Sequence, residues 1–335
     1  MTPLEQIREK LLIDEDLTGN VEGLRMMTKV SHLYHSKGMV QTDIAQKLGL
    51  SQARVSRLLS TAEEKGIVRR IVVAPLGLFS EIERRVEEKF GLDHVHIVDS
   101  AGENEEELMD SLGMALASVF HLMPIEGKTI GFTSWSRSLR SFVYSLSPFP
   151  RVGASKIIEM LGGVGQPSLQ HIATSATESF GKLTNAETIF LRVPGVVSSV
   201  LMRQALLESD SHARQALMEF EALDIALVGI GTADASAHIN QESNFFSTEQ
   251  FEQAQAAGAV AEINLRFIDQ QGRPVNTNLD DLVLGVSLDQ LRKVKLKIGV
   301  SGGPSKLNAT LAVANGKWVD VLVTDSDTAN FLLEN

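Results

Sequence analysis

The chain has 335 residues, of which 43% are hydrophobic and 22% charged, and its formal net charge is −11. This length and composition predict a globular protein of two or three domains. The negative net charge argues against a protein that binds nucleic acid over its whole surface. The sequence contains no cysteine, which excludes disulfides, cysteine-ligated metals and thiol catalysis. No apolar run approaches the roughly 20 residues needed to cross a bilayer, so we expect a cytoplasmic protein with no membrane partner.

The basic residues are concentrated near the beginning of the chain. The segment 22–75 contains nine lysines and arginines but only four acids, so it carries +5 while the remainder carries −16. A basic module joined to an acidic body is typical of a DNA-binding domain fused to a second domain. Charge alone leaves open a helical face that is basic by chance.

Apolar periodicity in this segment predicts a winged helix-turn-helix. Gly49 permits the tight turn between two helices, and Ser51 can cap the helix that follows, which would enter the major groove of DNA. Val40 departs from the usual pattern, because serine or threonine commonly caps the helix before the turn. The expected elements are helices over 24–34, 43–48 and 52–65 and a β-strand or ribbon over 67–73.

The helix after the turn supplies the side chains that would read the bases. Arginine pairs with guanine and glutamine with adenine, whereas arginines on the wing suit phosphates. The alternative for this module is a protein-docking unit with solvated basic residues. The predicted DNA-contacting residues are Gln41, Thr42, Ser51, Gln52, Arg54, Ser56, Arg57, Arg69 and Arg70.

A charged helix follows the basic module. Ser80 and Glu83 have the spacing of a capping box at its beginning. Farther along, an apolar stripe from Leu108 to Met123 is a candidate contact surface between subunits. We divide the chain into an N-terminal segment and winged helix-turn-helix domain (1–75), a linker helix (76–93) and an effector-binding and oligomerisation domain (94–335).

Strands and helices alternate through the rest of the chain. Several strands are continuous apolar runs, which indicates burial on both faces of a parallel sheet. Repeated strand–helix units predict a doubly wound, mostly parallel α/β domain. Strands are expected at 94–98, 129–133, 156–161, 187–193, 224–229, 296–300 and 319–324, and helices near 136–146, 168–183, 198–222, 248–257, 304–314 and 326–333.

Glycine- or serine-rich loops follow four of these strands. Because ligands bind beyond the carboxyl ends of parallel strands, the loops indicate a site for a small anion. Arg137 and Lys306 each lie at the beginning of a helix that follows such a loop. The alternative is that the glycines only permit tight turns. No phosphate-binding P-loop motif is present.

Other polar groups give weaker indications. His94 and His96 lack a further ligand nearby, and Asp325 stands where a helix cap belongs, so we expect no metal site and no cofactor. Glu262 and Asp269 flank a strand-like stretch, where two carboxylates could bind sugar hydroxyls or perform acid–base chemistry.

Two sets of motifs are similar to those of the SorC (sorbitol-operon regulator) family of sugar-responsive transcription regulators. The first set is the helix-turn-helix run 41–51 with 55–59. The second set lies in the tail and is more specific. It consists of the segments 258–262, 267–269, 301–306 and 324–329. The resemblance extends from about residue 22 to the end of the chain.

The resemblance implies an effector domain similar to sugar-phosphate isomerases and glucosamine-phosphate deaminases, a homo-oligomer that is a tetramer, and a phosphorylated sugar or polyol as effector. It also implies that Ser134–Ser138 is the phosphate-side loop and Lys306 a further anion contact. The chain departs from the family at Glu262, where aspartate is usual, and at Ser136, where the usual Trp-Gly-Arg-Thr motif has glycine.

We therefore predict a regulator of a carbohydrate or polyol utilisation operon that is not an enzyme and binds operator DNA. One alternative is a sugar-phosphate isomerase or deaminase-like enzyme with an accessory DNA-binding module, and another is a protein-docking adaptor. The predicted effector-binding residues are Ser134, Trp135, Ser136, Arg137, Ser138, Gly162, Gly163, Gly229, Gly231, Glu262, Asp269, Gly302, Gly303 and Lys306.

Overall fold

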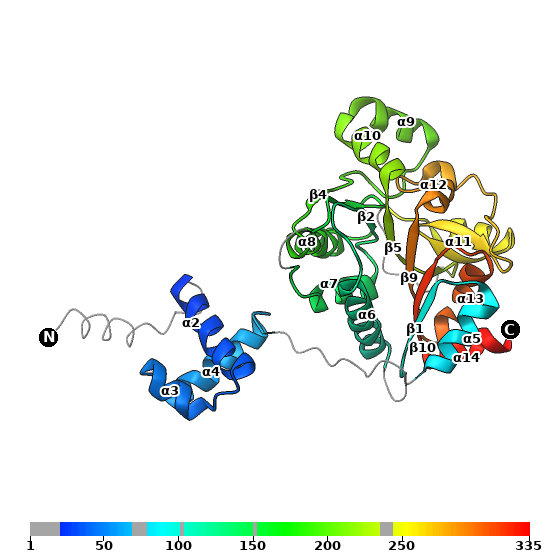
Figure 1. The fold of residues 1–335 in the computed structure, drawn as a ribbon. Helices are drawn as coiled ribbons and strands as arrows, with labels where there is room; N and C mark the ends of the chain where they lie inside the picture. The colour runs from blue at the N-terminus through cyan, green and yellow to red at the C-terminus, as the bar shows by residue number, and fades with distance from the viewer. Residues whose placement is uncertain (1–20, 69–78, 101–103, 150–152, 235–243) are drawn as a thin grey trace. The chain divides into compact units, whose positions relative to one another are not determined.

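The computed structural model describes residues 21–68, 79–100, 104–149, 153–234 and 244–335 (Figure 1). The chain separates into two compact units, with the division between Val72 and Val73. Among the helices of the described residues, none is both long and apolar enough to span a membrane.

The first unit is the predicted helix-turn-helix. Its core is formed by Met27, Val30, Ile44, Val55 and other apolar residues contributed by every helix of the unit. The wing expected over 67–73 lies largely outside the described residues. The helices are α2 (Val21–Ser31), a π-helical turn (His32–Ser36), α3 (Gln41–Leu48) and α4 (Gln52–Glu64).

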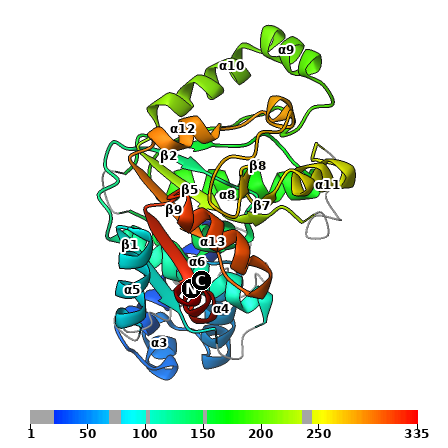
Figure 2. The same ribbon diagram turned by 90° about the vertical axis from the view of Figure 1, so that its right-hand side faces the viewer.

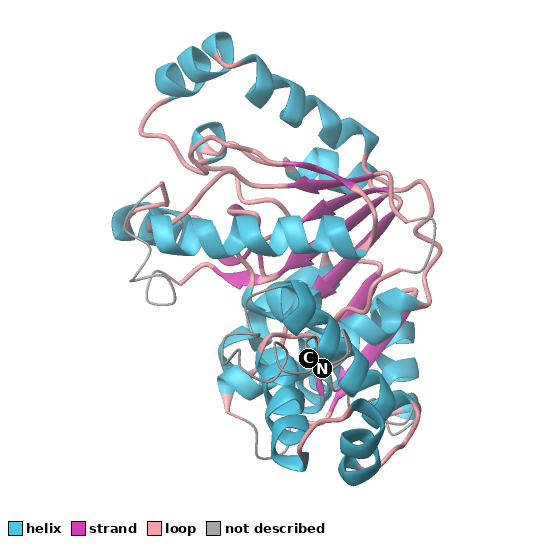
Figure 3. Ribbon diagram, turned by 90° about the vertical axis from the view of Figure 1, so that its left-hand side faces the viewer, coloured by secondary structure: helices cyan, strands magenta, loops and turns pink. Residues whose placement is uncertain are grey.

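The second unit contains a seven-stranded sheet in which every strand pair is parallel, in the order β1-β10-β9-β5-β2-β3-β4. This confirms the predicted doubly wound α/β class, and Figure 3 shows the aligned strands between helices. The strands are β1 (His94–Val98), β2 (Thr129–Phe132), β3 (Lys156–Glu159), β4 (Glu187–Ile189), β5 (Ile225–Gly229), β9 (Leu296–Val300) and β10 (Val321–Asp325).

Helices cover both faces of the sheet. Successive residues of each strand face opposite sides, so each strand packs against helices on both faces. On β5, Leu227 packs in the cluster formed with α6, α7 and α8, whereas Ala226 and Val228 pack in the cluster on the other face. The helices around the sheet are seen in Figure 1. The helices are α5 (Ser80–Phe90), α6 (Glu105–His121), α7 (Arg137–Ser145), α8 (Pro167–Leu183), α9 (Val200–Ser209), α10 (Ser211–Met218), α11 (Thr248–Ala256), α12 (Leu288–Lys293), α13 (Leu307–Asn315) and α14 (Ser326–Glu334).

A small antiparallel sheet, which the sequence did not predict, joins the loop after β5 to a hairpin. It contains β6 (Gly231–Thr232), β7 (Ala259–Ile263) and β8 (Arg266–Asp269), in that order. Asn264 and Leu265 both have positive φ, which lets two residues close the hairpin. The hairpin places Glu262 beside Gly231.

Three local predictions were wrong. Helix α5 has Phe79, not Ser80, at its N-cap, and the Glu83 carboxylate instead accepts a hydrogen bond from the Ile97 backbone N–H at 3.0 Å. The predicted helix over 198–222 breaks because Asp210 caps the first turn of α10, so α9 and α10 are separate helices (Figure 2). The stripe from Leu108 to Met123 is no subunit surface, because Leu112 and Leu116 are fully buried in the protein's own core.

The helix predicted as part of a linker packs within the second unit. Glu87 of α5 accepts a hydrogen bond from the Val95 backbone N–H of β1 at 2.8 Å, and the Lys89 ammonium donates to the Leu332 carbonyl of α14 at 2.9 Å. These contacts tie α5 to the edge of the sheet.

Candidate functional site

The helix-turn-helix exposes several of its predicted DNA-contacting residues. Gly49 ends α3 in the left-handed region at φ 66°, and the Ser51 hydroxyl caps α4 by accepting a hydrogen bond from the Arg54 N–H at 3.2 Å. Val40 caps α3 without a side-chain hydrogen bond.

The side chains of Gln52, Ser56 and Arg57 are exposed on α4, and Arg54 is half-buried. On α3, Thr42 is exposed and Gln41 is half-buried. Arg69 and Arg70 lie outside the described residues. A continuous polar face on α4 therefore remains available while Val55, Leu58 and Leu59 pack inward.

The second unit contains a large cavity at the carboxyl ends of β2, β5 and β9. Its volume is about 900 Å³, and residues from several segments far apart in the sequence line it. The cavity brings together most of the predicted effector-binding residues. Those that line it are Trp135, Ser136, Arg137, Ser138, Gly229, Gly231, Glu262, Gly302 and Lys306.

The beginning of α7 supplies one side of this large cavity. Ser136 occupies the N-cap position, but its side chain makes no cap hydrogen bond. The first-turn N–H groups of a helix lack intrahelical partners and attract anions. Arg137 extends from this turn and forms an exposed ion pair with Glu105, which also lines the cavity.

Arg140 also lines the large cavity, and sequence reasoning missed it. It donates a hydrogen bond to the Trp135 carbonyl, and burial lowers its pKa. A spacing of three residues from Arg137 places both arginines on one helix face. That spacing was the signal that could have identified it.

Lys306 and Glu262 also line the large cavity. The Lys306 ammonium donates to the Ile230 carbonyl, and burial lowers the pKa of this lysine although Glu262 opposes the shift. Glu262 is 2% exposed and accepts a hydrogen bond from the Leu265 N–H at 2.6 Å. Burial raises the pKa of Glu262 to about 7, whereas the hydrogen bond from Leu265 and the charge of Lys306 act to lower it. The large cavity thus contains a partly desolvated lysine beside a carboxyl group.

Two glycines of the site are required by close approach. A Cβ on Gly231 would lie 1.7 Å from Glu262 Oε1, and one on Gly302 would lie 2.4 Å from Asp325 Oδ2. These glycines make room for carboxylates.

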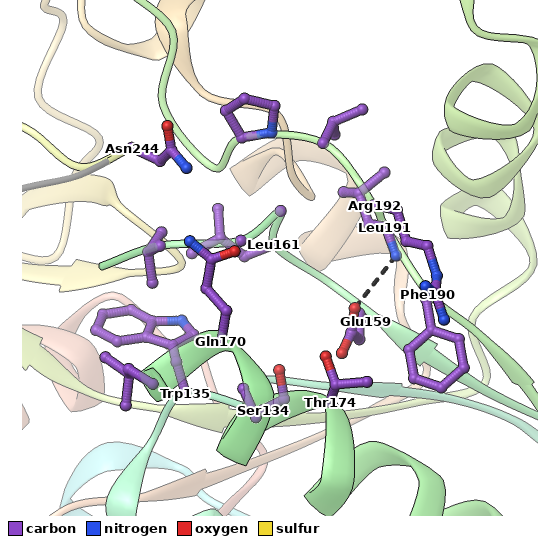
Figure 4. Close-up of a pocket in the computed structure, with 17 residues that line it drawn as sticks. Ser134, Trp135, Glu159, Leu161, Gln170, Thr174, Phe190, Leu191, Arg192 and Asn244 are labelled. Atoms are coloured by element: carbon purple, nitrogen blue, oxygen red, sulfur yellow. Dashed lines mark hydrogen bonds between the residues drawn. The ribbon is translucent and has the colours of Figure 1, made fainter. Parts of the chain in front are cut away.

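Five predicted residues lie elsewhere. Asp269 accepts hydrogen bonds from the Gln271 and Arg273 backbone N–H groups and so holds its own turn together. The Gly303 N–H donates to Asp325 Oδ2 at 2.8 Å. Three others, Ser134, Gly162 and Gly163, line a second, smaller cavity of about 400 Å³ (Figure 4).

The weaker metal indications have structural explanations. Asp325 caps α14 by accepting hydrogen bonds from the Asp327 and Thr328 N–H groups. Within the described residues, no group of three or more histidine, aspartate or glutamate side chains is arranged to hold a metal ion.

Comparison with known proteins assigns both units. Residues 75–334 match the family described as "Putative sugar-binding domain", and residues 30–75 match the MarR family. The sorbitol operon regulator of Klebsiella pneumoniae is 29% identical over 320 residues, which cover 94% of this chain and 99% of that protein. The deoxyribonucleoside regulator of Bacillus subtilis is 26% identical, with 94% and 99% covered.

A solved structure of such a regulator is similar to this chain over nearly its whole length. The crystal structure of the full-length sorbitol operon regulator SorC from Klebsiella pneumoniae matches with a TM-score of 0.72 at 27% identity, over 94% of this chain and 100% of that one.

Proposed function

The chain belongs to the SorC family of sugar-binding transcriptional regulators, and from this premise we propose that it controls a carbohydrate or polyol utilisation operon in response to a phosphorylated sugar or polyol. The relatives compared above are named as regulators, and the chain is a transcriptional regulator rather than an isomerase or deaminase. We assign it to the cytoplasm, where operator DNA lies.

Lys306 is the observation that carries the phosphate assignment. Half-buried Lys306 lines the same large cavity as the beginning of α7, where Ser136 makes no side-chain cap hydrogen bond. A partly desolvated ammonium gains more from an anion than an exposed one, because the local dielectric screens the attraction less. Arg137 and Arg140 line the same space, so a phosphate would meet three cations and a helix N-terminus.

Glu262 would face the hydroxyl end of the effector. A carboxylate repels phosphate but accepts hydrogen bonds from sugar hydroxyls, and a protonated carboxyl can also donate one. Its pKa of about 7 makes both forms accessible near neutrality.

The first unit would bind the operator. Arg54 and Arg57 make no ion pair within the described residues, so their guanidinium groups are available for bases or phosphates. One such helix covers few base pairs, and we propose a homo-oligomer, a tetramer as the family resemblance implies, that binds repeated half-sites. The effector would act by binding one arrangement of this oligomer more tightly than another.

The DNA assignment is tested by Arg54→Ala and Arg57→Ala. If these arginines contact bases, each variant should lose about 1–3 kcal/mol of binding free energy on DNA selected from a random pool by the wild-type protein. Fluorescence anisotropy measures this, with Arg25→Ala as control because Arg25 lies outside α3 and α4 and pairs with Glu22. Wild-type affinity in both α4 variants would remove α4 from the interface.

The effector assignment is tested by a thermal-shift screen. A ligand that binds only the folded protein raises its melting temperature. We expect sugar and polyol monophosphates to raise it more than the same compounds without phosphate. Equal shifts for both sets would contradict the phosphate assignment.

A further inference from the structure

The smaller cavity, shown in Figure 4, lies at the carboxyl ends of β2, β3 and β4. Trp135 and Leu169 line both cavities. The two spaces therefore adjoin at these two residues. A ligand held in the large cavity is adjacent to this second space.

Several polar side chains that line the smaller cavity have hydrogen-bonding capacity that the described residues leave unused. The side chains of Thr174, Arg192 and Asn244 make no hydrogen bond within the described residues, and Figure 4 shows them around one space. The Trp135 indole N–H is shielded from solvent, and no acceptor for it lies among the described residues. An unsatisfied buried donor costs free energy, which a ligand oxygen would recover.

Glu159 forms the floor of this cavity and is 8% exposed. Its carboxyl group accepts hydrogen bonds from the Thr177 hydroxyl at 3.0 Å and the Leu191 N–H at 3.2 Å. Burial raises its pKa to about 7, and the hydrogen bonds from Thr177 and Leu191 oppose that shift. A carboxyl group has further acceptor capacity and, when protonated, one donor. The Glu159 carboxyl group can therefore form hydrogen bonds with the hydroxyl groups of a ligand.

The backbone around the cavity does not suit an anion. The Gly162 N–H donates to the Leu284 carbonyl at 2.9 Å, and the Gly163 N–H donates to the Val193 carbonyl at 2.8 Å. These amides are already used, so they form no anion-binding nest. The Glu159 carboxylate would repel a phosphate on the cavity floor.

We propose that the smaller cavity is a subsite for an uncharged polyhydroxyl chain, recognised by Glu159, Trp135 and the side chains of Thr174 and Asn244. The inference deepens the proposed function and rests on it: the phosphate occupies the large cavity, and the hydroxylated carbon chain passes Trp135 into the smaller one. A separate unphosphorylated polyol has the same chemistry and is the second possible source of the chain.

A second phosphate is the alternative ligand for the smaller cavity, because Arg192 lies at its rim. Arg192 is exposed and stacks over the Phe190 ring, 5.0 Å from its centroid. It is the only cation among the described residues that line this cavity. One exposed arginine above a buried carboxyl group is a weaker anion site than the three cations of the large cavity.

The test compares ligands of different length on matched variants. The probes are inorganic phosphate, glycerol 3-phosphate, glucitol 6-phosphate, unphosphorylated glucitol and fructose 1,6-bisphosphate. Trp135→Phe removes the indole N–H but keeps a ring, and Ala173→Leu fills the cavity. Trp318→Phe is the matched control, because its buried indole N–H donates to the Gly272 carbonyl at 2.8 Å and lies in neither cavity.

Calorimetry should show that Trp135→Phe and Ala173→Leu each weaken glucitol 6-phosphate binding about tenfold. Ala173 lines only the smaller cavity, so Ala173→Leu should leave glycerol 3-phosphate binding within about twofold of wild type. Trp318→Phe should lower the melting temperature and leave both affinities unchanged. Wild-type affinity for glucitol 6-phosphate in both cavity variants would overturn the subsite. So would a bisphosphate that binds about tenfold more tightly than the monophosphates and loses that advantage in Arg192→Gln.

Two further outcomes separate this subsite from the proposed function. If no phosphate compound binds but glucitol binds and depends on Trp135, the subsite stands and the phosphate assignment fails. If glucitol binds together with inorganic phosphate, the occupant is a separate polyol, whereas binding of glucitol 6-phosphate alone identifies the chain of the effector itself.

Discussion

The loops after β9 and β3 look alike in sequence but serve different purposes. Both contain paired glycines after a buried parallel strand. In each, a glycine makes room for another group: Gly302 for the Asp325 carboxylate and Gly162 for the Val193 carbonyl. Only the loop after β9 leads to a cation, Lys306. Paired glycines therefore indicate close packing, whereas the charged residue beside them indicates the ligand.

Gly162→Ala should give the largest effect and sharpen this distinction. The added Cβ would lie 2.5 Å from the Val193 carbonyl oxygen, and overpacking of this kind costs about 3 kcal/mol of unfolding free energy. Urea denaturation measures the loss. Gly258→Ala is the control, because its Cβ meets nothing within 4 Å and only the positive φ is strained. Equal losses in the two variants would show that the β3 loop is not tightly packed.

Lys306→Ala should affect binding instead of packing. Losing one of the three cations of the large cavity should weaken binding of a sugar phosphate about 30-fold, or about 2 kcal/mol. The matched control is Lys297→Ala, which removes a lysine of β9 that is 7% exposed and pairs with Asp320 at 2.7 Å, outside the cavity. That control should lower stability and keep ligand affinity. Unchanged affinity in Lys306→Ala would move the phosphate elsewhere.

Glu159→Gln should change the pH dependence of stability. Burial raises the folded-state pKa of Glu159 to about 7, above the ordinary value of 4.5. The folded protein therefore holds a proton that the unfolded chain releases, and the free energy of unfolding falls as pH rises from about 5 to 7. The variant should flatten this fall by roughly 2 kcal/mol. If the variant keeps the wild-type dependence of unfolding free energy on pH, Glu159 is ionised in the folded protein.

Periodicity and apolar runs predicted most of the fold. The helices of the first unit, the parallel strands and the helices between them follow from local pattern, because each buries one face or both faces in a fixed repeat. The break at Asp210 was missed because the apolar stripe continues across it, and the cap depends on one side chain.

The site could be predicted only where motif and strand end coincide. Lys306 and Ser136–Ser138 lie beside strand ends, so they fall in the large cavity as expected. The Glu262 hairpin, Arg140 and the smaller cavity depend on contacts between segments far apart in sequence, such as Thr133 with Asn264 at 2.9 Å. No spacing rule encodes such contacts.

We propose that a phosphorylated effector in the large cavity sets DNA affinity. The most direct test is operator affinity, measured by fluorescence anisotropy on selected DNA, with and without the sugar phosphate found in the screen. We predict that the effector changes wild-type affinity at least about tenfold, a coupling of about 1.4 kcal/mol. Lys306→Ala should bind DNA as wild type does without effector and should need about 30 times more effector to respond. A wild-type response in Lys306→Ala, or no response in the wild-type protein to a ligand that binds it, would contradict the account.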